Sequence, residues 1–175
     1  HVDDEPPTAG PPSVDLSSGG RVGTDGAVPV RVSWAPAVDN ASSIAAYDVA
    51  AAANGAPAGT WTADGSTTVL PVSQAAGAGV TYGLRAVDTA GNVSTEAISR
   101  RTAVRLTEDT SGAVSRSGSW TTYASAGASG GHASSSSTAG ASLTFTVNAG
   151  HRQMALVGTK GPTRGKARIY LDGRL

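Results

Sequence analysis

The sequence predicts an all-β protein, and three of its features agree on this. Gly provides 23 of the 175 residues while Phe and Met occur once each, so turns and small side chains dominate. Stretches in which apolar and polar residues alternate recur along the chain, which is the period-2 pattern of half-buried strands. Turn formers such as Asp64-Gly65 separate these stretches. Long helices are therefore not expected.

Length and charge narrow the organisation of the chain. Its 175 residues suit two small domains, given about 100 to 150 residues for a usual domain. The formal net charge is zero, so no overall attraction to nucleic acid or to an anionic membrane is expected. Residues 1–104 carry ten acids against five arginines, a balance of −5, and residues 105–175 carry eight bases against three acids, a balance of +5. The two halves can attract one another or neighbouring copies, although exposed pairs contribute little individually.

The sequence lacks features that several kinds of site, and a place in the membrane, would require. It has no cysteine, which excludes disulfides, thiolate metal ligands and cysteine nucleophiles. No apolar run approaches the roughly 18 residues of a membrane span, so no membrane partner is predicted. The sequence opens with HVDDEPP, without Met or a signal peptide. We therefore expect a processed or excised piece of a longer polypeptide.

The first element is a linker and the second a strand with a large aromatic residue. Residues 1–11 are acidic and then Pro-rich, a composition typical of an extended linker between modules. Residues 28–34 alternate between apolar and polar side chains, with Trp34 on the apolar face. Trp34 is predicted to anchor a core, because burying about 200 Å² of indole stabilises by up to about 5 kcal/mol at about 25 cal/mol/Å².

The middle of the first half predicts three more strands. Residues 44–53 keep Tyr47 in phase with valine and alanine, so we predict a strand, although the alanine content also suits a helix. Residues 59–63 and 67–72 are predicted as a hairpin about the Asp64-Gly65 turn.

The clearest strand covers residues 80–88, where Val80, Tyr82 and Leu84 share one parity. It ends in the turn-forming residues 88–92. Residues 95–106 supply the closing strand of the first half.

These strands number about seven in about a hundred residues, which suits an immunoglobulin-like sandwich. The opening PPT, VSWAPAVDN with Trp34, IAAYDV with Tyr47 and YGLRAVDTAGNVS together resemble a fibronectin type III domain of the bacterial extracellular kind. The resemblance covers about residues 6–106, and we place the domain itself at residues 12–106.

The resemblance implies a role for two residues of the strand at 80–88. Tyr82 stands where such folds carry the tyrosine corner, whose hydroxyl bonds back to the backbone. Leu84 stands where antibody domains carry a cysteine, so the disulfide-bearing kind of domain does not apply.

A second region, residues 113–175, follows a polar linker at residues 107–112. Residues 127–140 are nearly pure Gly, Ala and Ser and suit either a loop or a thin strand. The strand-like stretches of this region are residues 115–123, 143–147 and 167–171.

The segments GSW, SGGHASSS, AGASLTFTV and MALVGTKGPTRGKARIYLDG resemble a β-sandwich module found near the C-termini of secreted actinobacterial proteins, including hydrolases. Related modules continue for several strands past the equivalent of Asp172-Gly173. Residues 113–175 are therefore expected to form a partial sandwich with an open apolar face and sheet edge. Either the rest of a longer polypeptide or a neighbouring chain is expected to complete it.

One nucleophile pattern occurs in the second region. Gly127-Ala-Ser129-Gly-Gly131 matches GxSxG, and His132 follows. That chemistry needs the serine on a strained turn from a strand into a helix, with an acid and a histidine from elsewhere. A segment this rich in Gly and Ser produces the pattern by chance. No catalytic residue and no organic cofactor is therefore predicted, and a hydrolase is the least supported interpretation.

A site for an anionic polysaccharide is the first of two predicted binding sites. The glycines at 161 and 165 fail the phosphate-loop pattern, since three residues rather than four separate them and Ala167 follows Lys166. A basic turn is the simpler interpretation, although its cations suit a wall polysaccharide, and aromatic rings stack on sugars. The predicted ligand residues are Trp120, Tyr123, Lys160, Arg164 and Lys166.

The second predicted site is for calcium, where the acidic linker approaches the loop after residue 88. Asp3, Asp4, Asp88 and Asn92 offer the oxygen ligands that calcium takes. The spacing of a 12-residue calcium loop is missing, and a solvated linker beside a turn stabilised by its own side chains is the simpler interpretation, with calcium as the alternative. The histidines have no zinc-site spacing, so calcium is the one ion predicted.

The sequence therefore predicts a non-catalytic accessory or spacer region of a secreted bacterial protein, located outside the cell, with weak polysaccharide or cell-wall binding. The alternative is a structural subunit of an extracellular assembly, in which a partner chain adds strands to the second region. Neither nucleic acid nor membrane is an expected partner.

Overall fold

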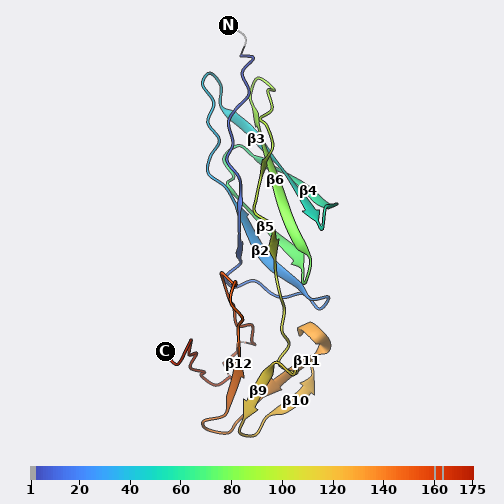
Figure 1. The fold of residues 1–175 in the computed structure, drawn as a ribbon, viewed down its shortest axis with the longest axis vertical. Coiled ribbons are helices and arrows are strands. Elements are labelled where there is room, and N and C mark those ends of the chain that lie inside the picture. Colours follow the sequence, from blue (N-terminus) through green and yellow to red (C-terminus); the bar gives the residue numbers. More distant parts are fainter. Residues whose placement is uncertain (1–2, 160, 163) are drawn as a thin grey trace.

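The computed structural model describes residues 3–159, 161–162 and 164–175, and it confirms the prediction of an all-β chain. Figure 1 shows a larger N-terminal part and a smaller C-terminal part placed end to end. The N-terminal part, here called the N-terminal sandwich, contains β1 (Ser13–Leu16), β2 (Ala27–Ser33), β3 (Ile44–Ala53), β4 (Ala56–Asp64), β5 (Val69–Ala75), β6 (Gly79–Asp88), β7 (Ala97–Ile98) and β8 (Thr102–Ala103). The C-terminal part contains β9 (Val114–Ser117), β10 (Thr121–Ala124), the 3-10 turn η1 (Ser129–Gly131), β11 (His132–Ser135) and β12 (Ser142–Phe145). Over the described ranges, no helix is long and apolar enough to cross a membrane.

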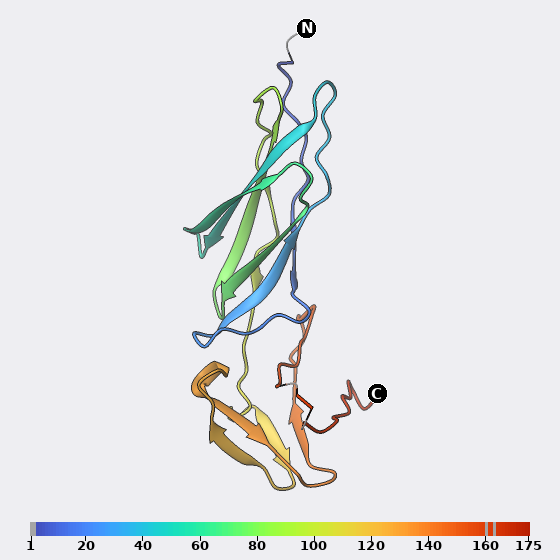
Figure 2. The ribbon, with the colours of Figure 1, turned by 180° about the vertical axis from the view of Figure 1, so that it is seen from behind.

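Two antiparallel sheets build the N-terminal sandwich (Figures 1 and 2). The first sheet has the strand order β1-β2-β5, and the second has the order β4-β3-β6-β7, with β8 also paired to β6. The alternating apolar side chains of β2, β3 and β6 pack into one core shared by both sheets, as the period-2 pattern predicts. The largest fully buried side chains are Tyr47, Tyr82, Leu84, Val30, Val32, Val49 and Asp88.

Trp34 lies in this core, as predicted, with only 6% of its surface exposed. Its ring meets that of Tyr47 edge to face, with the ring centroids 5.4 Å apart, which is a preferred aromatic geometry. Trp34 follows β2 of the first sheet and Tyr47 belongs to β3 of the second. The aromatic pair therefore joins the two sheets across the core.

The predicted hairpin about Asp64-Gly65 is wrong, because the strands on either side of this turn belong to different sheets. β4 pairs with β3, whereas β5 pairs with β2. The hairpin is instead β3-β4, with φ of 50° at Asn54 and 86° at Gly55 in its turn. Positive φ at both central residues matches the twist of the flanking strands, and Asn-Gly is the dipeptide that best adopts it.

Asp64 begins the turn that carries the chain from the second sheet to the first. Its Oδ1 accepts hydrogen bonds from the hydroxyl of Ser66 at 2.5 Å and from the N–H groups of Ser66 and Thr67 at 2.9 and 3.1 Å. These bonds, led by the Ser66 hydroxyl, hold the pKa of Asp64 below its usual range. The N–H of Gly65 donates to the carbonyl of Ala45 at 2.9 Å, so the turn packs backbone against backbone.

The tyrosine that is tied to the backbone is Tyr47, and the tyrosine-corner prediction for Tyr82 is wrong. The Tyr47 hydroxyl accepts a hydrogen bond of 2.8 Å from the N–H of Ala37, in the loop after β2. The Tyr82 hydroxyl instead faces Oε1 of Gln74, a side chain of β5, at 3.5 Å. Burial raises the pKa of Tyr82.

Replacing Tyr47 with Phe is expected to lower the free energy of unfolding by about 1 to 2 kcal/mol, because the N–H of Ala37 loses its acceptor. Tyr82→Phe is the matched control and is expected to cost less, since a 3.5 Å contact is at the limit of hydrogen bonding. Urea unfolding of both variants measures the difference. Equal losses would contradict the assignment of the tied tyrosine to Tyr47.

The predicted closing strand at residues 95–106 is reduced to the two short pieces β7 and β8. Beside them, buried serine side chains pair with β6. Oγ of Ser94 accepts from the N–H of Ala86, and Oγ of Ser99 accepts from the N–H of Tyr82, each at 2.9 Å. A hydroxyl in place of a carbonyl interrupts the regular ladder and still leaves both buried donors paired.

The C-terminal part contains two separate two-stranded antiparallel sheets, β10-β11 and β12-β9. The strand-like stretch at 115–123 divides into β9 and β10, with Gly118 at φ 80° between them. The stretch at 127–140 contains η1 and β11, so its Gly, Ala and Ser residues form a thin strand as well as loop.

The strand predicted at residues 167–171 is wrong. Among the described residues of 146–175, the one pairing is an isolated bridge between Leu171 and Arg174. A strand gains little stability in water without further strands or a helix against it. As a result, β12 and the segment after it expose large apolar side chains: Leu143, Phe145, Met154, Leu156, Val157, Ile169, Tyr170, Leu171 and Leu175.

Among the described residues, the side chains of Gln153 and Arg21 form hydrogen bonds between the C-terminal part and the N-terminal sandwich. Oε1 of Gln153 accepts from the N–H of Leu16 at 2.7 Å, and its Nε2 donates to Oδ1 of Asp15 at 2.6 Å. The guanidinium of Arg21 donates to the carbonyl of Gly127 at 3.2 Å. Gln153 thereby satisfies polar groups at the outer edge of β1.

Candidate metal centre

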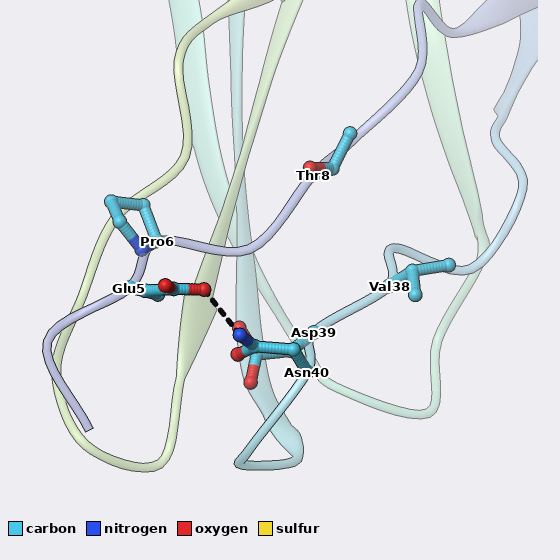
Figure 3. Close-up of a pocket in the computed structure, with 6 residues that line it drawn as sticks. All are labelled: Glu5, Pro6, Thr8, Val38, Asp39 and Asn40. Atoms are coloured by element: carbon cyan, nitrogen blue, oxygen red, sulfur yellow. Dashed lines mark hydrogen bonds between the residues drawn. The ribbon is translucent and has the colours of Figure 1, made fainter. Parts of the chain in front are cut away.

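Three segments meet at the end of the sandwich where the chain begins: the linker, the β2-β3 loop and the loop after β6 (Figure 1). The linker lies along the β2-β3 loop, because Thr8 and Val38 exchange two backbone hydrogen bonds of 2.8 and 3.0 Å. Figure 3 shows Glu5 of the linker directed at Asn40 of the loop, to which it is hydrogen-bonded. A shallow hollow of about 280 Å³ lies between the linker and the loop.

Asp39 begins a turn in the β2-β3 loop. Its Oδ1 accepts from the N–H groups of Ser42 and Ala41 at 2.7 and 3.0 Å, and from the Ser42 hydroxyl at 3.2 Å. These bonds, led by the backbone N–H of Ser42, hold the pKa of Asp39 below its usual range. Since all three hydrogen bonds go to Oδ1, none of them is accepted by Oδ2. Oδ2 of Asp39 is buried and has no hydrogen-bond partner among the described residues.

Asp88 ends β6, and only 2% of its surface is exposed. Asn92, in the same turn, donates to both carboxylate oxygens, from its N–H to Oδ1 and from its Nδ2 to Oδ2, each at 2.8 Å. Burial on its own raises the pKa of Asp88, but the bonds led by the Asn92 side chain outweigh it, and the pKa lies below its usual range. Asp88 is therefore a buried carboxylate that is ionised at neutral pH.

Asp3 brings the linker to the same place. Its Oδ1 accepts from the N–H of Glu5 at 3.2 Å, and its backbone carbonyl accepts from Nδ2 of Asn92 at 3.2 Å. Oδ2 of Asp3 is buried, and the part of the chain that the structure describes offers it no hydrogen bond.

The three carboxylates form one cluster, in which one oxygen from each of Asp3, Asp39 and Asp88 lies within 4.8 Å of the other two. Ionised carboxylates at this spacing repel one another. Within the described ranges none of the three has an ion pair, and the salt bridge found there joins Arg116 to Asp109 in the C-terminal part. A set of oxygen ligands with a charge of about −3 is what a hard divalent cation binds.

The structure brings together three of the four residues predicted for calcium: Asp3, Asp88 and Asn92. Asp4 is exposed and lies outside the cluster. Asp39, which the prediction omitted, takes its place. The Asp-Asn-Ala-Ser segment signals a turn, but only the pairing of Thr8 with Val38 places that turn beside the linker.

The GxSxG match gains no support from the geometry. Oγ of Ser129 donates to Oε1 of Glu108 at 2.6 Å. Nδ1 of His132 lies 2.9 Å from the carbonyl oxygen of Gly130, so this nitrogen is engaged locally and does not contact the serine. The GxSxG chemistry pairs its serine with a histidine, and among the described residues the partner of the Ser129 hydroxyl is Glu108 instead.

The residues predicted to bind polysaccharide have no hydrogen bond or ion pair to one another within the part of the chain that the structure describes. Trp120 and Tyr123 lie half-buried at β10, and Nε1 of Trp120 donates to a backbone carbonyl of β9 at 3.0 Å. Arg164 and Lys166 are exposed in the segment after β12. Lys160 lies outside the described residues. No hydrogen bond or ion pair between the other four, all of them described, joins the aromatic pair to the basic pair.

Comparison with protein-family models and with curated proteins finds no match for this chain. The acidic cluster at the linker is thus the candidate site with the most developed geometry.

Proposed function

We propose that this chain is a non-catalytic accessory region of a secreted bacterial protein, in which a fibronectin type III-like, immunoglobulin-like sandwich is a spacer ahead of part of a second sandwich. The observation that carries the proposal is that the chain begins at one end of the N-terminal sandwich and leaves at the opposite end (Figures 1 and 2). A module with its two connections at opposite ends separates its neighbours by its own length. The three-stranded and five-stranded antiparallel sheets around Trp34 support the sandwich type.

Contacts at both ends of the sandwich support a spacer that also orients the segments on either side of it. At the beginning, the bridge between Thr8 and Val38 aligns the linker with the sandwich. At the other end, Gln153 bonds to the edge of β1. These contacts are few and polar, so they favour one arrangement of the parts, while relative motion stays the default for an interface of this kind.

Small-angle X-ray scattering of the whole chain tests the spacer proposal. A compact protein of this length has a radius of gyration of about 16 Å, and the end-to-end arrangement is expected to give a clearly larger value. Gln153→Ala is the matched variant, since it removes the contact with β1 and is expected to broaden the distribution of distances. A radius of gyration near 16 Å would contradict the proposal.

The proposal includes weak binding of a wall or extracellular polysaccharide, with Trp120 as the aromatic face and Arg164 and Lys166 as cations. Co-sedimentation with insoluble cell-wall polysaccharide measures this binding. Trp120→Ala is expected to reduce the bound fraction. If wild type and variant bind equally, or neither binds, this clause is withdrawn and the spacer role remains.

A second candidate function is a structural subunit of an extracellular assembly, in which a partner chain adds strands to the C-terminal part. The observation that favours it is the set of exposed apolar side chains on β12 and after it, next to unpaired strand edges. The opposite charges of the two halves add attraction between copies. Light scattering that gives a mass of 17.2 kDa at every concentration would contradict this candidate.

A further inference from the structure

The acidic cluster lacks the positive charge that its burial calls for. Three carboxylates converge: Asp88 is 2% exposed, and Asp3 and Asp39 are partly exposed. A buried charge is expensive unless it is paired and hydrogen-bonded. Asn92 supplies hydrogen bonds to Asp88 but no charge. The cluster is therefore arranged for a positive group that the described side chains do not provide.

Two buried carboxylate oxygens that have no hydrogen-bond partner are the strongest indication that a positive group binds here. Oδ2 of Asp3 and Oδ2 of Asp39 are both sealed from solvent and both lack a hydrogen bond from any described residue. In each residue the other oxygen, Oδ1, is held by backbone N–H groups, which fixes the orientation of the carboxylate. Unpaired carboxylate oxygens are costly when buried, and here two from distant parts of the chain are buried in the same cluster.

We propose that Asp3, Asp39 and Asp88 form a calcium site that fastens the N-terminal linker to the sandwich. The ligands are Oδ2 of Asp3, Oδ2 of Asp39 and a carboxylate oxygen of Asp88. An oxygen bonded to Asn92 keeps a second lone pair for the ion. Asp39 also lines the shallow hollow between the linker and the β2-β3 loop (Figure 3).

The ligand set selects calcium over other common cations. Zinc and copper sites use His or Cys, and the cluster contains neither. Magnesium demands near-ideal octahedral geometry and keeps its water, whereas calcium accepts six to eight oxygens in irregular arrangements. Three carboxylates from a linker, a loop and the end of a strand are an irregular set. Modules outside the cell bind calcium with dissociation constants of about 10⁻⁴ to 10⁻³ M, and that is the range we expect.

Calcium bound at this site is expected to restrict the motion of the linker more than that of the sandwich. Asp39 and Asp88 already belong to the folded sandwich, while Asp3 belongs to the linker. A bound ion therefore joins residue 3 directly to the β2-β3 loop and to the end of β6. The binding of calcium is independent of the proposed function. Its consequence, a linker that is stiff with calcium and mobile without it, rests on the spacer role.

Calcium titration of the whole chain after treatment with EDTA tests the site. Isothermal titration calorimetry is expected to give one site in the range above, and calcium at ten times the dissociation constant should raise the ratio of folded to unfolded protein about elevenfold. Magnesium at the same concentration should bind clearly more weakly. No binding heat and no rise in Tm with calcium, or equal binding of the two ions, would overturn the proposal.

Asp3→Asn is the decisive variant, because Asp3 lies in the linker and its loss leaves the core of the sandwich intact. It is expected to weaken calcium binding at least tenfold. Asp4→Asn is the matched control, since it makes the same charge change at the neighbouring residue outside the cluster, and it should bind like the wild type. Equal weakening by both variants would mean diffuse attraction to acidic residues and would overturn the site.

Hydrogen exchange separates calcium binding from its effect on the linker. Calcium is expected to slow the exchange of the amide protons of residues 3–8 in the wild type and not in Asp3→Asn. Calcium binding without slower exchange would overturn the fastening of the linker. Neither result depends on the radius of gyration, so failure of the spacer proposal is recognised separately.

Discussion

Replacing Trp34 with Ala is expected to remove most of the stability of the N-terminal sandwich. Truncating a buried aromatic residue costs about 3 to 5 kcal/mol, and a domain is stable by about 5 to 15 kcal/mol in total. Trp34 packs between the sheets with 6% exposure and an edge-to-face contact with Tyr47. The variant therefore loses core burial and the aromatic pair together. Urea unfolding followed by far-ultraviolet circular dichroism measures the loss.

Trp34→Phe is the companion variant if Trp34→Ala does not fold. Nε1 of Trp34 is buried, and the described residues give it no hydrogen-bond acceptor. Phe keeps an aromatic ring against Tyr47 and removes this unpaired donor, which offsets part of the cavity that it leaves. Its loss is expected to be a fraction of that of Trp34→Ala. Equal stability of Trp34→Ala and the wild type would show that Trp34 is not the core anchor.

Gly65→Ala is expected to have the second largest effect, at the upper end of the roughly 1 to 3 kcal/mol of overpacked sites. A Cβ at this position would overlap the carbonyl oxygen of Ile44 and lie 2.6 Å from its carbonyl carbon. These are backbone atoms beside an irregularity in the pairing of β3 with β6, between Ile44 and Ala46. They cannot turn away as a flexible side chain does, so either the turn or the strand must shift. The shift also strains the bond between Gly65 and Ala45.

Gly10→Ala is the control for this prediction. A Cβ there meets no atom within 4 Å, and its backbone does not have positive φ. Its stability is expected to match or slightly exceed that of the wild type, because Ala restricts the unfolded chain more than Gly does. Differential scanning calorimetry of both variants gives the comparison. A Gly65→Ala protein with the Tm of Gly10→Ala would show that the close backbone contact is absent in solution.

The strands whose side chains alternate could be predicted from the sequence because one face of each is buried. Residues 28–34, 44–53 and 80–88 keep their pattern in β2, β3 and β6, where the core imposes it. The partners of β4 and β5, which are β3 and β2, could not be predicted in the same way. Asp-Gly favours a hairpin turn, but the Ser and Thr residues after Asp64 capture its side chain and turn the chain toward the other sheet.

The strand predicted at residues 167–171 is absent from the structure for a different reason. The alternation at residues 167–171 describes which side chains would share a face if a strand formed. It does not supply the neighbouring strand that a sheet requires. Where neighbours exist, as for β9 with β12, even four residues pair.

The cluster of acids shows where local patterns stop being informative. Asp3, Asp88 and Asn92 could be suggested because a linker and a late loop often meet at one end of such a domain. Asp39 could not, because its approach depends on the backbone bridge between Thr8 and Val38. A contact between main-chain atoms 30 residues apart cannot be recognised from the residue types, because nearly every residue has the same backbone donor and acceptor.

The placement of β1 determines how the protein responds to mechanical load. A pull on the two ends of the N-terminal sandwich acts along its long axis (Figure 1), and β1 is the first strand after the linker along the chain. Ladder hydrogen bonds of an antiparallel pair lie across the strands, so this force shears the four paired positions of β1 and β2 together and does not open them one at a time. Gln153 is hydrogen-bonded to the same strand, so a displacement of β1 also breaks this contact with the C-terminal part.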